Sequence, residues 1–148
     1  LSLKMLEKSA QLNVYQRLEH KELLEMMRAE SDASYDLIAA SDVFVYLGKL
    51  DDIVAEAKRL LRHNGIFAFS TESLEALPES KSLTAPRDFI LNDTGRYAHS
   101  MTYLEMLAQD KGFKVLEVKE EPIRLDKDKT IIGYLTLWLR ANDDLEIK

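Results

Sequence analysis

Three groups of polar side chains in this sequence have types and spacing that suit chemistry. Ser41-Asp42 directly follows one short apolar run, and Ser70-Thr71-Glu72 directly follows another. Arg96, Tyr97 and His99 stand close together near the end of a long polar stretch. A carboxylate or a histidine can take a proton from a reacting group, and histidine titrates near neutral pH. These residues therefore predict a site that binds a polar ligand and supports proton transfer.

The segments around the first two groups predict a strand, a helix and a second strand. Residues 35–40 (YDLIAA) form a short apolar run, as expected of a buried parallel strand. A stripe of apolar residues at helical spacing follows, made of Leu50, Ile53, Val54, Ala57, Leu60 and Leu61. Asn64-Gly65 is predicted to stop this helix, because both residue types accept a left-handed backbone. Residues 66–69 (IFAF) then predict a second buried strand.

This strand–helix–strand unit predicts where the polar groups lie. Parallel strands joined by a helix present their carboxyl ends at the same edge of a sheet, and ligands of open α/β sheets bind at that edge. We therefore expect Ser41-Asp42 and Ser70-Thr71-Glu72 to meet at a common rim.

Residues 35–72 resemble the second half of a class I S-adenosylmethionine-dependent methyltransferase. Residues 61–65 (LRHNG) stand where that family has an "LkPGG" motif, with departures at His63 and Asn64. Within the family the chain is most similar to the predicted methyltransferases associated with TPR repeats, and residues 95–100 (GRYAHS) are a further point of similarity.

The resemblance implies the fold class. It is α/β, with a Rossmann-like, mostly parallel sheet, helices on both faces and a C-terminal antiparallel strand pair. Residues 113–118 and 130–140 are the predicted pair, and Pro122 argues that the continuation of the first lies at an edge or leaves the sheet. The chain is interpreted as one partial domain, residues 1–148, in which 72–99 form a lid loop over the site and 141–148 a frayed tail.

The resemblance also implies S-adenosyl-L-methionine as cofactor and methyl transfer to an unidentified acceptor, either a small molecule or a protein. Asp42, Tyr97 and His99 are the candidate catalytic residues around the acceptor. The positions that the resemblance assigns to the cofactor are Leu1, Ser2, Met5, Glu22, Leu23, Ser41, Asp42 and Tyr46. Among them, Met5 is expected to pack on the adenine ring, and Glu22 to accept a hydrogen bond from the adenine amino group.

Structural interpretations stand beside these functional ones. Met5 also suits an ordinary core position in a helix over residues 3–11, and Glu22 also suits the start of a helix, where the dipole favours a carboxylate. Asp42 also suits a turn. His99 also suits a loop position satisfied by the helix that follows it.

Two other functions remain open at this stage. One is a non-catalytic binding or assembly domain that keeps the methyltransferase fold. The other is a different doubly wound protein, such as a nucleotide-binding dehydrogenase, since fold does not fix function.

Composition excludes several classes of protein. The absence of cysteine rules out a disulfide scaffold and thiolate metal sites, and the three histidines lack metal-ligand spacing. A net charge of −6 argues against a nucleic-acid-binding surface. No apolar run is long enough for a membrane span, and no leader opens the chain, so we expect a cytoplasmic protein.

The chain begins in the middle of the resemblance. The family's first strand and its glycine-rich loop are absent, so we expect a fragment of a longer protein that is inactive alone. Val14 to Leu18 predicts a short edge strand. Without the missing strand, the strand at 35–40 has an open edge, and such edges recruit partners. We therefore expect either a homo-oligomer through this edge or displacement of roughly the first thirty residues, which would lack hydrogen-bonding partners.

Overall fold

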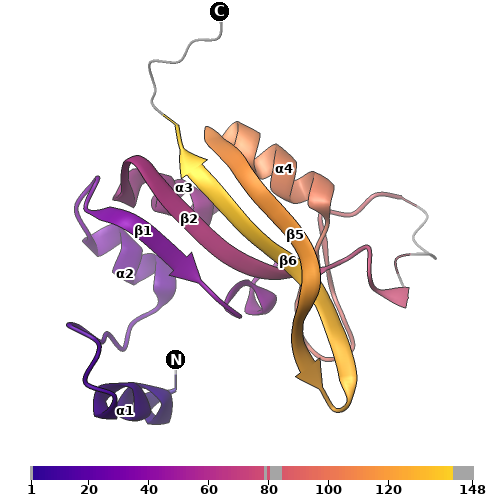
Figure 1. Ribbon diagram of the computed structural model, residues 1–148, viewed down its shortest axis with the longest axis horizontal. Coiled ribbons are helices and arrows are strands. Elements are labelled where there is room, and N and C mark those ends of the chain that lie inside the picture. The colour runs from indigo at the N-terminus through magenta and orange to yellow at the C-terminus, as the bar shows by residue number, and fades with distance from the viewer. Residues whose placement is uncertain (1, 79, 81–84, 142–148) are drawn as a thin grey trace, which may run out of the picture.

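The computed structural model describes residues 2–78, 80 and 85–141. Its centre is β2 (Leu61–Ser73), which pairs with three other strands and lies between β1 and β6 in Figure 1. β1 (Tyr35–Ala40) pairs with β2 in parallel, and β6 (Lys129–Arg140) pairs with its other edge in antiparallel orientation. The strand–helix–strand prediction is thereby confirmed.

Three further strands complete the six-stranded sheet. β5 (Phe113–Asp126) pairs antiparallel with β6 and forms one end of the sheet. β4 (Tyr97–His99) runs parallel to the end of β2, and β3 (Phe89–Leu91) pairs antiparallel with β4. The α/β fold class, the closing antiparallel pair and the edge position of Pro122 are all confirmed.

Four α-helices and one short 3₁₀ helix lie among the described residues. Their bounds are α1 (Leu3–Gln11), α2 (Leu23–Ala29), η1 (Phe44–Tyr46), α3 (Asp51–Leu60) and α4 (Met101–Asp110). Ser100 caps α4, because its side chain accepts a hydrogen bond from the Tyr103 amide.

The end of α3 differs from the prediction. The helix stops at Leu60, and Leu61 is already extended and begins β2. Asn64 does adopt a left-handed backbone, with φ of 63°, but it does so inside β2. Pairing with β1 is irregular there, because Tyr35 pairs with Leu61 whereas Leu37 pairs with Ile66. The left-handed residue thus serves a bulge in the sheet and not the helix end.

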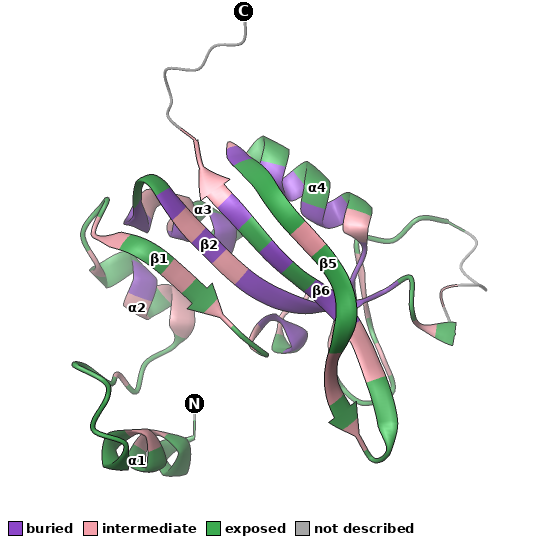
Figure 2. Cartoon of the chain, in the orientation of Figure 1, coloured by how far each residue is buried: buried purple, intermediate pink, exposed green. Residues whose placement is uncertain are grey.

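One face of the sheet carries the core. Phe67 and Phe69 from β2 and Trp138 from β6 point to this face, and their rings lie 4.8–6.2 Å apart between centroids. Buried residues of α2, α3 and α4 belong to the same cluster. Figure 2 shows exposed and buried bands in alternation along β6. On the other face, Leu135 and Leu137 are exposed, so the predicted helical cover of that face is not seen in the described part of the chain.

The N-terminal predictions are only partly right. α1 has the predicted bounds, yet it buries no residue, and Met5 is 68% exposed, so the interpretation of Met5 as a core residue is wrong. Figure 1 shows α1 apart from the sheet. The strand predicted at Val14 to Leu18 is also wrong. A strand needs a neighbour to take its backbone hydrogen bonds, and this segment has none among the described residues.

Two predictions concern segments that the structure describes in part. β3 and β4 occupy the end of the predicted 72–99 lid, and residues 79 and 81–84 of it lie outside the description, as do 142–148 of the predicted tail. In the described chain β1 pairs only with β2, and Leu37 on it is 58% exposed, so this strand is less buried than predicted. Self-association through its edge stays a prediction.

Phe67 offers a test of the core. Replacing it by alanine removes the ring that touches Phe44, Phe69, Phe113 and Trp138. We expect Phe67→Ala to lower the free energy of unfolding by about 3–5 kcal/mol, as measured by urea denaturation with Trp138 fluorescence as the probe. Leu125→Ala, at a residue that is 75% exposed, is the control and should change it by less than about 0.5 kcal/mol. Equal effects of the two substitutions would contradict this description of the core.

Candidate functional site

The carboxyl end of β1 and the second half of β2 form a common rim. The Asp42 amide donates a hydrogen bond of 3.0 Å to the Ser70 hydroxyl, across the gap between the two strands. Because β1 and β2 run in parallel, Asp42, the second residue after β1, reaches the side chain that follows Phe69 in β2. The predicted meeting of Ser41-Asp42 with Ser70 to Glu72 is confirmed.

An arginine from the far end of the sheet joins this rim. Arg124 in β5 donates from Nη1 to Asp42 Oδ1 at 3.1 Å, and from Nη2 to Glu72 Oε1. Asn92 donates to the other Glu72 oxygen at 3.0 Å. The rim is therefore a network of two carboxylates bridged by one guanidinium, and its members come from the bend after β1, from β2 and β5, and from the turn after β3.

The two carboxylates of the network have different surroundings. Glu72 is only 1% exposed, and its burial raises the pKa of its carboxyl group above the ordinary value, against the opposing effects of the Arg96 charge and the Asn92 hydrogen bond. Asp42 has a side chain that is 51% exposed. Asp42 is thus accessible to a ligand, whereas Glu72 is enclosed by its partners.

Tyr46 extends the rim on the side of η1. Its ring is exposed, and the Arg96 guanidinium lies 5.8 Å from the ring centroid, within the range of a cation–π contact. Arg96 also influences Glu72 through its charge. These contacts connect Tyr46 with the same charged network as Asp42.

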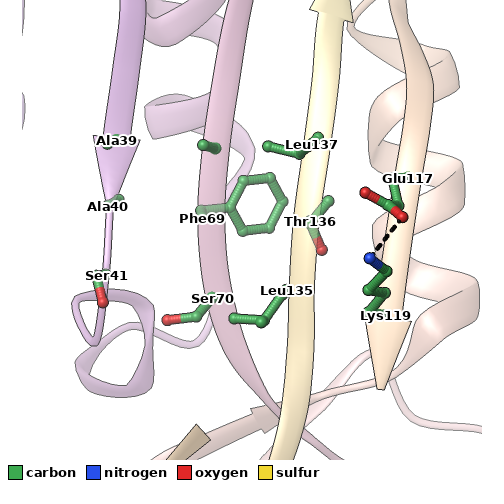
Figure 3. Close-up of a pocket in the computed structure, with 11 residues that line it drawn as sticks. Ala39, Ala40, Ser41, Phe69, Ser70, Glu117, Lys119, Leu135, Thr136 and Leu137 are labelled. Carbon is green, nitrogen blue, oxygen red and sulfur yellow. Dashed lines mark ion pairs between the residues drawn. The ribbon is translucent and has the colours of Figure 1, made fainter. Parts of the chain in front are cut away.

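A shallow pocket lies on the exposed face of the sheet beside the rim (Figure 3). Its volume is about 370 Å³, and Ser41 and Ser70 line one end of it. The Glu117–Lys119 ion pair, at 2.9 Å, lies at another side. The floor is mainly apolar, with Ala39, Ala40, Ala68, Leu135 and Leu137. The pocket can therefore take a molecule with an apolar body and a polar group directed at the rim.

Tyr97 and His99 lie on a different face of β4 from this network. The His99 ring is buried, and its Nε2–H donates to the Gly48 carbonyl at 2.9 Å. Tyr97 packs edge to face on Phe89 at 5.9 Å. The described contacts of both rings are with these neighbours and not with Asp42, so the structure does not join the three candidate catalytic residues in one cluster. A catalytic role for Tyr97 or His99 stays a prediction.

Comparisons with known proteins bear on this geometry. Residues 1–69 match the family model described as "Methyltransferase domain". The comparison with curated proteins gives no match. The pairing of β1 and β2 that builds the rim falls largely within the matched segment.

Solved structures extend the likeness over nearly the whole chain. A Listeria monocytogenes protein assigned as an S-adenosylmethionine-dependent methyltransferase has a TM-score of 0.72 and 17% identity, and the match covers 96% of this chain and 78% of that one. The chain has the methyltransferase fold.

Two other structures share this fold. One is the 1,6-didemethyltoxoflavin-N1-methyltransferase of Burkholderia thailandensis, solved with 1,6-didemethyltoxoflavin and S-adenosylhomocysteine (TM-score 0.69, 14% identity, 96% of this chain and 59% of that one). Another is the [4+2]-cyclase SpnF (TM-score 0.64, 13% identity, 92% and 60%). The methyltransferase fold therefore also carries a different reaction. No helix in the described residues has the length and apolar character to cross a membrane.

The remaining positions assigned to the cofactor are scattered over this methyltransferase fold. Leu1 lies outside the described residues, and Ser2 and Met5 are exposed on or beside α1. Glu22 caps α2, since its side chain accepts a hydrogen bond of 2.9 Å from the Glu25 amide, which lowers the pKa of Glu22. Leu23 follows it in α2 and packs against the core. Glu22 therefore lies at the start of a helix, as its structural interpretation expects, and its role in cofactor binding stays a prediction.

Sequence reasoning missed Arg124. The sequence around Arg124 does not distinguish it from the other charged residues between positions 114 and 129, where positive and negative side chains are mixed. One signal was present, because Pro122 lies two positions earlier, and proline inside a strand often marks a bulge that redirects side chains.

His99 predicts how stability depends on pH. Burial lowers the pKa of its imidazole below the ordinary value of 6.5, against hydrogen bonds to the Gly48 and Leu47 carbonyls. The unfolded chain then binds a proton more readily than the folded one, so the free energy of unfolding should fall as the pH drops below about 6.5.

The measurement is urea denaturation at several pH values between 5 and 7.5. We expect His99→Gln to reduce the slope of unfolding free energy against pH in this range by up to about 1.4 kcal/mol per unit, the effect of one proton. His63→Gln, at an exposed position of β2, is the control. An unchanged slope in His99→Gln would show that this ring is not held neutral by the fold.

Proposed function

We propose that the chain is part of a methyltransferase that transfers the methyl group of S-adenosylmethionine to a small-molecule or protein acceptor, and that it belongs to a longer protein of the cytoplasm. The observation that carries the proposal is the position of the rim. The Asp42–Ser70 contact lies at the carboxyl ends of two parallel strands, which is where α/β sheets bind their ligands, in a chain whose first 69 residues match a methyltransferase domain.

The residues of the rim fit such a cofactor. S-adenosylmethionine supplies a methyl group that is already activated on a sulfonium, so the protein's task is mainly alignment. Asp42 offers an exposed carboxylate that accepts hydrogen bonds or holds a cationic group. Ser41 and Ser70 add hydroxyl groups at the mouth of the pocket.

The two carboxylates of the rim differ in whether they can take a proton from the acceptor. If the acceptor must lose a proton, Asp42 is the carboxylate that takes it, because solvent and ligand can reach its side chain. Glu72 is buried and held by Arg124 and Asn92, so it supports the site without contacting the acceptor. Tyr46, exposed beside Arg96, suits packing on a flat ligand.

A non-catalytic binding or assembly domain is the second candidate. It is favoured by the burial of His99, which leaves one predicted proton acceptor without access to the rim. A third outcome is another reaction on this fold, since the fold shared with SpnF does not determine the chemistry. Binding of S-adenosylhomocysteine, the product formed from the methyl donor, distinguishes the methyltransferase from the non-catalytic domain.

The test is calorimetric titration of S-adenosylhomocysteine into residues 1–148 and into the longer natural protein. We expect dissociation constants in the micromolar range, roughly −8 kcal/mol, in the longer protein. Asp42→Asn should weaken this binding about tenfold, because it removes the charge of the accessible carboxylate.

Asp36→Asn is the matched control, since Asp36 lies on β1, the strand that leads to Asp42, and pairs with Arg62 at 2.6 Å away from the rim. It should leave the affinity unchanged. Absence of binding in folded samples of both proteins would end the methyltransferase proposal and favour the binding domain.

A further inference from the structure

β5 contains a bulge next to the rim. Pro122 pairs with Ile132, and Arg124 pairs with Ile131, so Ile123 is an extra residue on the β5 side. Proline is tolerated at such a position because a bulge does not need its missing N–H group. Side chains alternate between the two faces of a sheet, so one extra residue moves every later side chain of the strand to the opposite face.

The bulge decides which face Arg124 occupies. Before it, Glu120 pairs with Tyr134 on the core face. In unbroken alternation Arg124 would share that face with Glu120. The extra residue turns it to the face of Glu72, where it meets the carboxylates of the rim.

Gly133 makes room for this bulge. A Cβ atom on Gly133 would lie 2.5 Å from Ile123 Cδ1 and 2.2 Å from the Thr71 carbonyl oxygen. Both distances are far below van der Waals contact, so a larger residue at this position would displace Ile123 or β2. The position of Arg124 therefore depends on a glycine in the neighbouring strand.

Asp42 needs to be held in place. Its φ of 54° lies in the left-handed region, which is unfavourable for a residue with a side chain. Two contacts fix it, one from its amide to Ser70 and one from Arg124 to its carboxylate. Among the described residues, only one of the two carboxylate oxygens of Asp42 has a partner, so the other is left for a ligand.

The Arg124 contact differs from an ordinary surface ion pair. The Arg124 side chain is 15% exposed and Glu72 is almost fully buried, so both charges have lost most of their water. A planar guanidinium that bridges two carboxylates has little freedom to move. By contrast, Lys119 pairs with Glu117 on the same strand with both side chains exposed, and such pairs contribute little.

We propose that Arg124 is a positioning residue: held by buried Glu72 and turned to the rim by the bulge at Ile123, it fixes the carboxylate of Asp42 in the orientation that binds the ligand. The role of Asp42 toward a methyl donor rests on the proposed function. The positioning of Asp42 by Arg124 does not.

The test therefore combines a measurement without ligand and one with S-adenosylhomocysteine. Without ligand, we expect Arg124→Gln to speed hydrogen exchange of the Asp42 amide at least about tenfold, with β2 amides around Phe67 unchanged. With ligand, the affinity of the longer protein should fall about tenfold, and Asp42→Asn combined with Arg124→Gln should weaken it no further than Asp42→Asn alone.

Three further variants sharpen the test. Arg124→Lys keeps the charge and should restore part of both effects. Gly133→Ala keeps Arg124 but displaces Ile123, and it should speed exchange at Asp42 as Arg124→Gln does. Lys114→Gln, at an exposed position of the same strand outside the pocket, should change neither measurement.

The outcomes separate the two proposals. Unchanged Asp42 exchange in Arg124→Gln overturns the positioning role, whatever the ligand does. Faster Asp42 exchange without any binding of S-adenosylhomocysteine to the wild-type protein supports positioning and counts against the methyltransferase. Arg124→Gln could also speed exchange throughout the sheet, and the Arg124→Lys variant then distinguishes the two roles. If Arg124→Lys does not restore slow exchange of the Asp42 amide, Arg124 has only a structural role.

Discussion

The structure depends on the pairing of β2 along both of its edges. β1 and then β4 take one edge in parallel, and β6 takes the other in antiparallel orientation, so few backbone groups of this long strand lack a partner. Pairing on both sides fixes the alternation of its side chains. Phe67 and Phe69 therefore point to the core face. Ser70 and Glu72 point to the opposite face from Phe69 and Thr71.

This alternation explains how a charged network coexists with an aromatic core. Glu72 and Ser70 point away from Trp138, and they meet Asp42 and Arg124 at the rim. Glu72 is nevertheless enclosed, and a buried carboxylate is costly unless it is paired. Arg124 and Asn92 supply that pairing, while the half-exposed Asp42 uses one carboxylate oxygen for Arg124. The other face holds His99 in a dry setting against Gly48.

The sequence predicted the elements that local pattern determines. Strands β1 and β2 and the apolar stripe of α3 follow from period and burial, and the meeting of Asp42 with Ser70 follows from parallel pairing. Prediction from the sequence failed where an element depends on contacts with residues far away along the chain. The segment at Val14 has strand-like residues without a partner strand, and the end of α3 was set by the pairing of Leu61 with Tyr35. Arg124 was missed because its face is set by a bulge, which only the register with β6 reveals.

The bulge at Ile123 has a consequence for how this hairpin can change in evolution. A deletion or insertion of a single residue in β5 between Pro122 and Arg124 would carry the Arg124 side chain to the opposite face of the sheet. Changes by two residues would preserve sidedness. Homologous hairpins that keep an arginine at the rim should therefore change the number of residues between the paired start of β5 and that arginine only by even numbers.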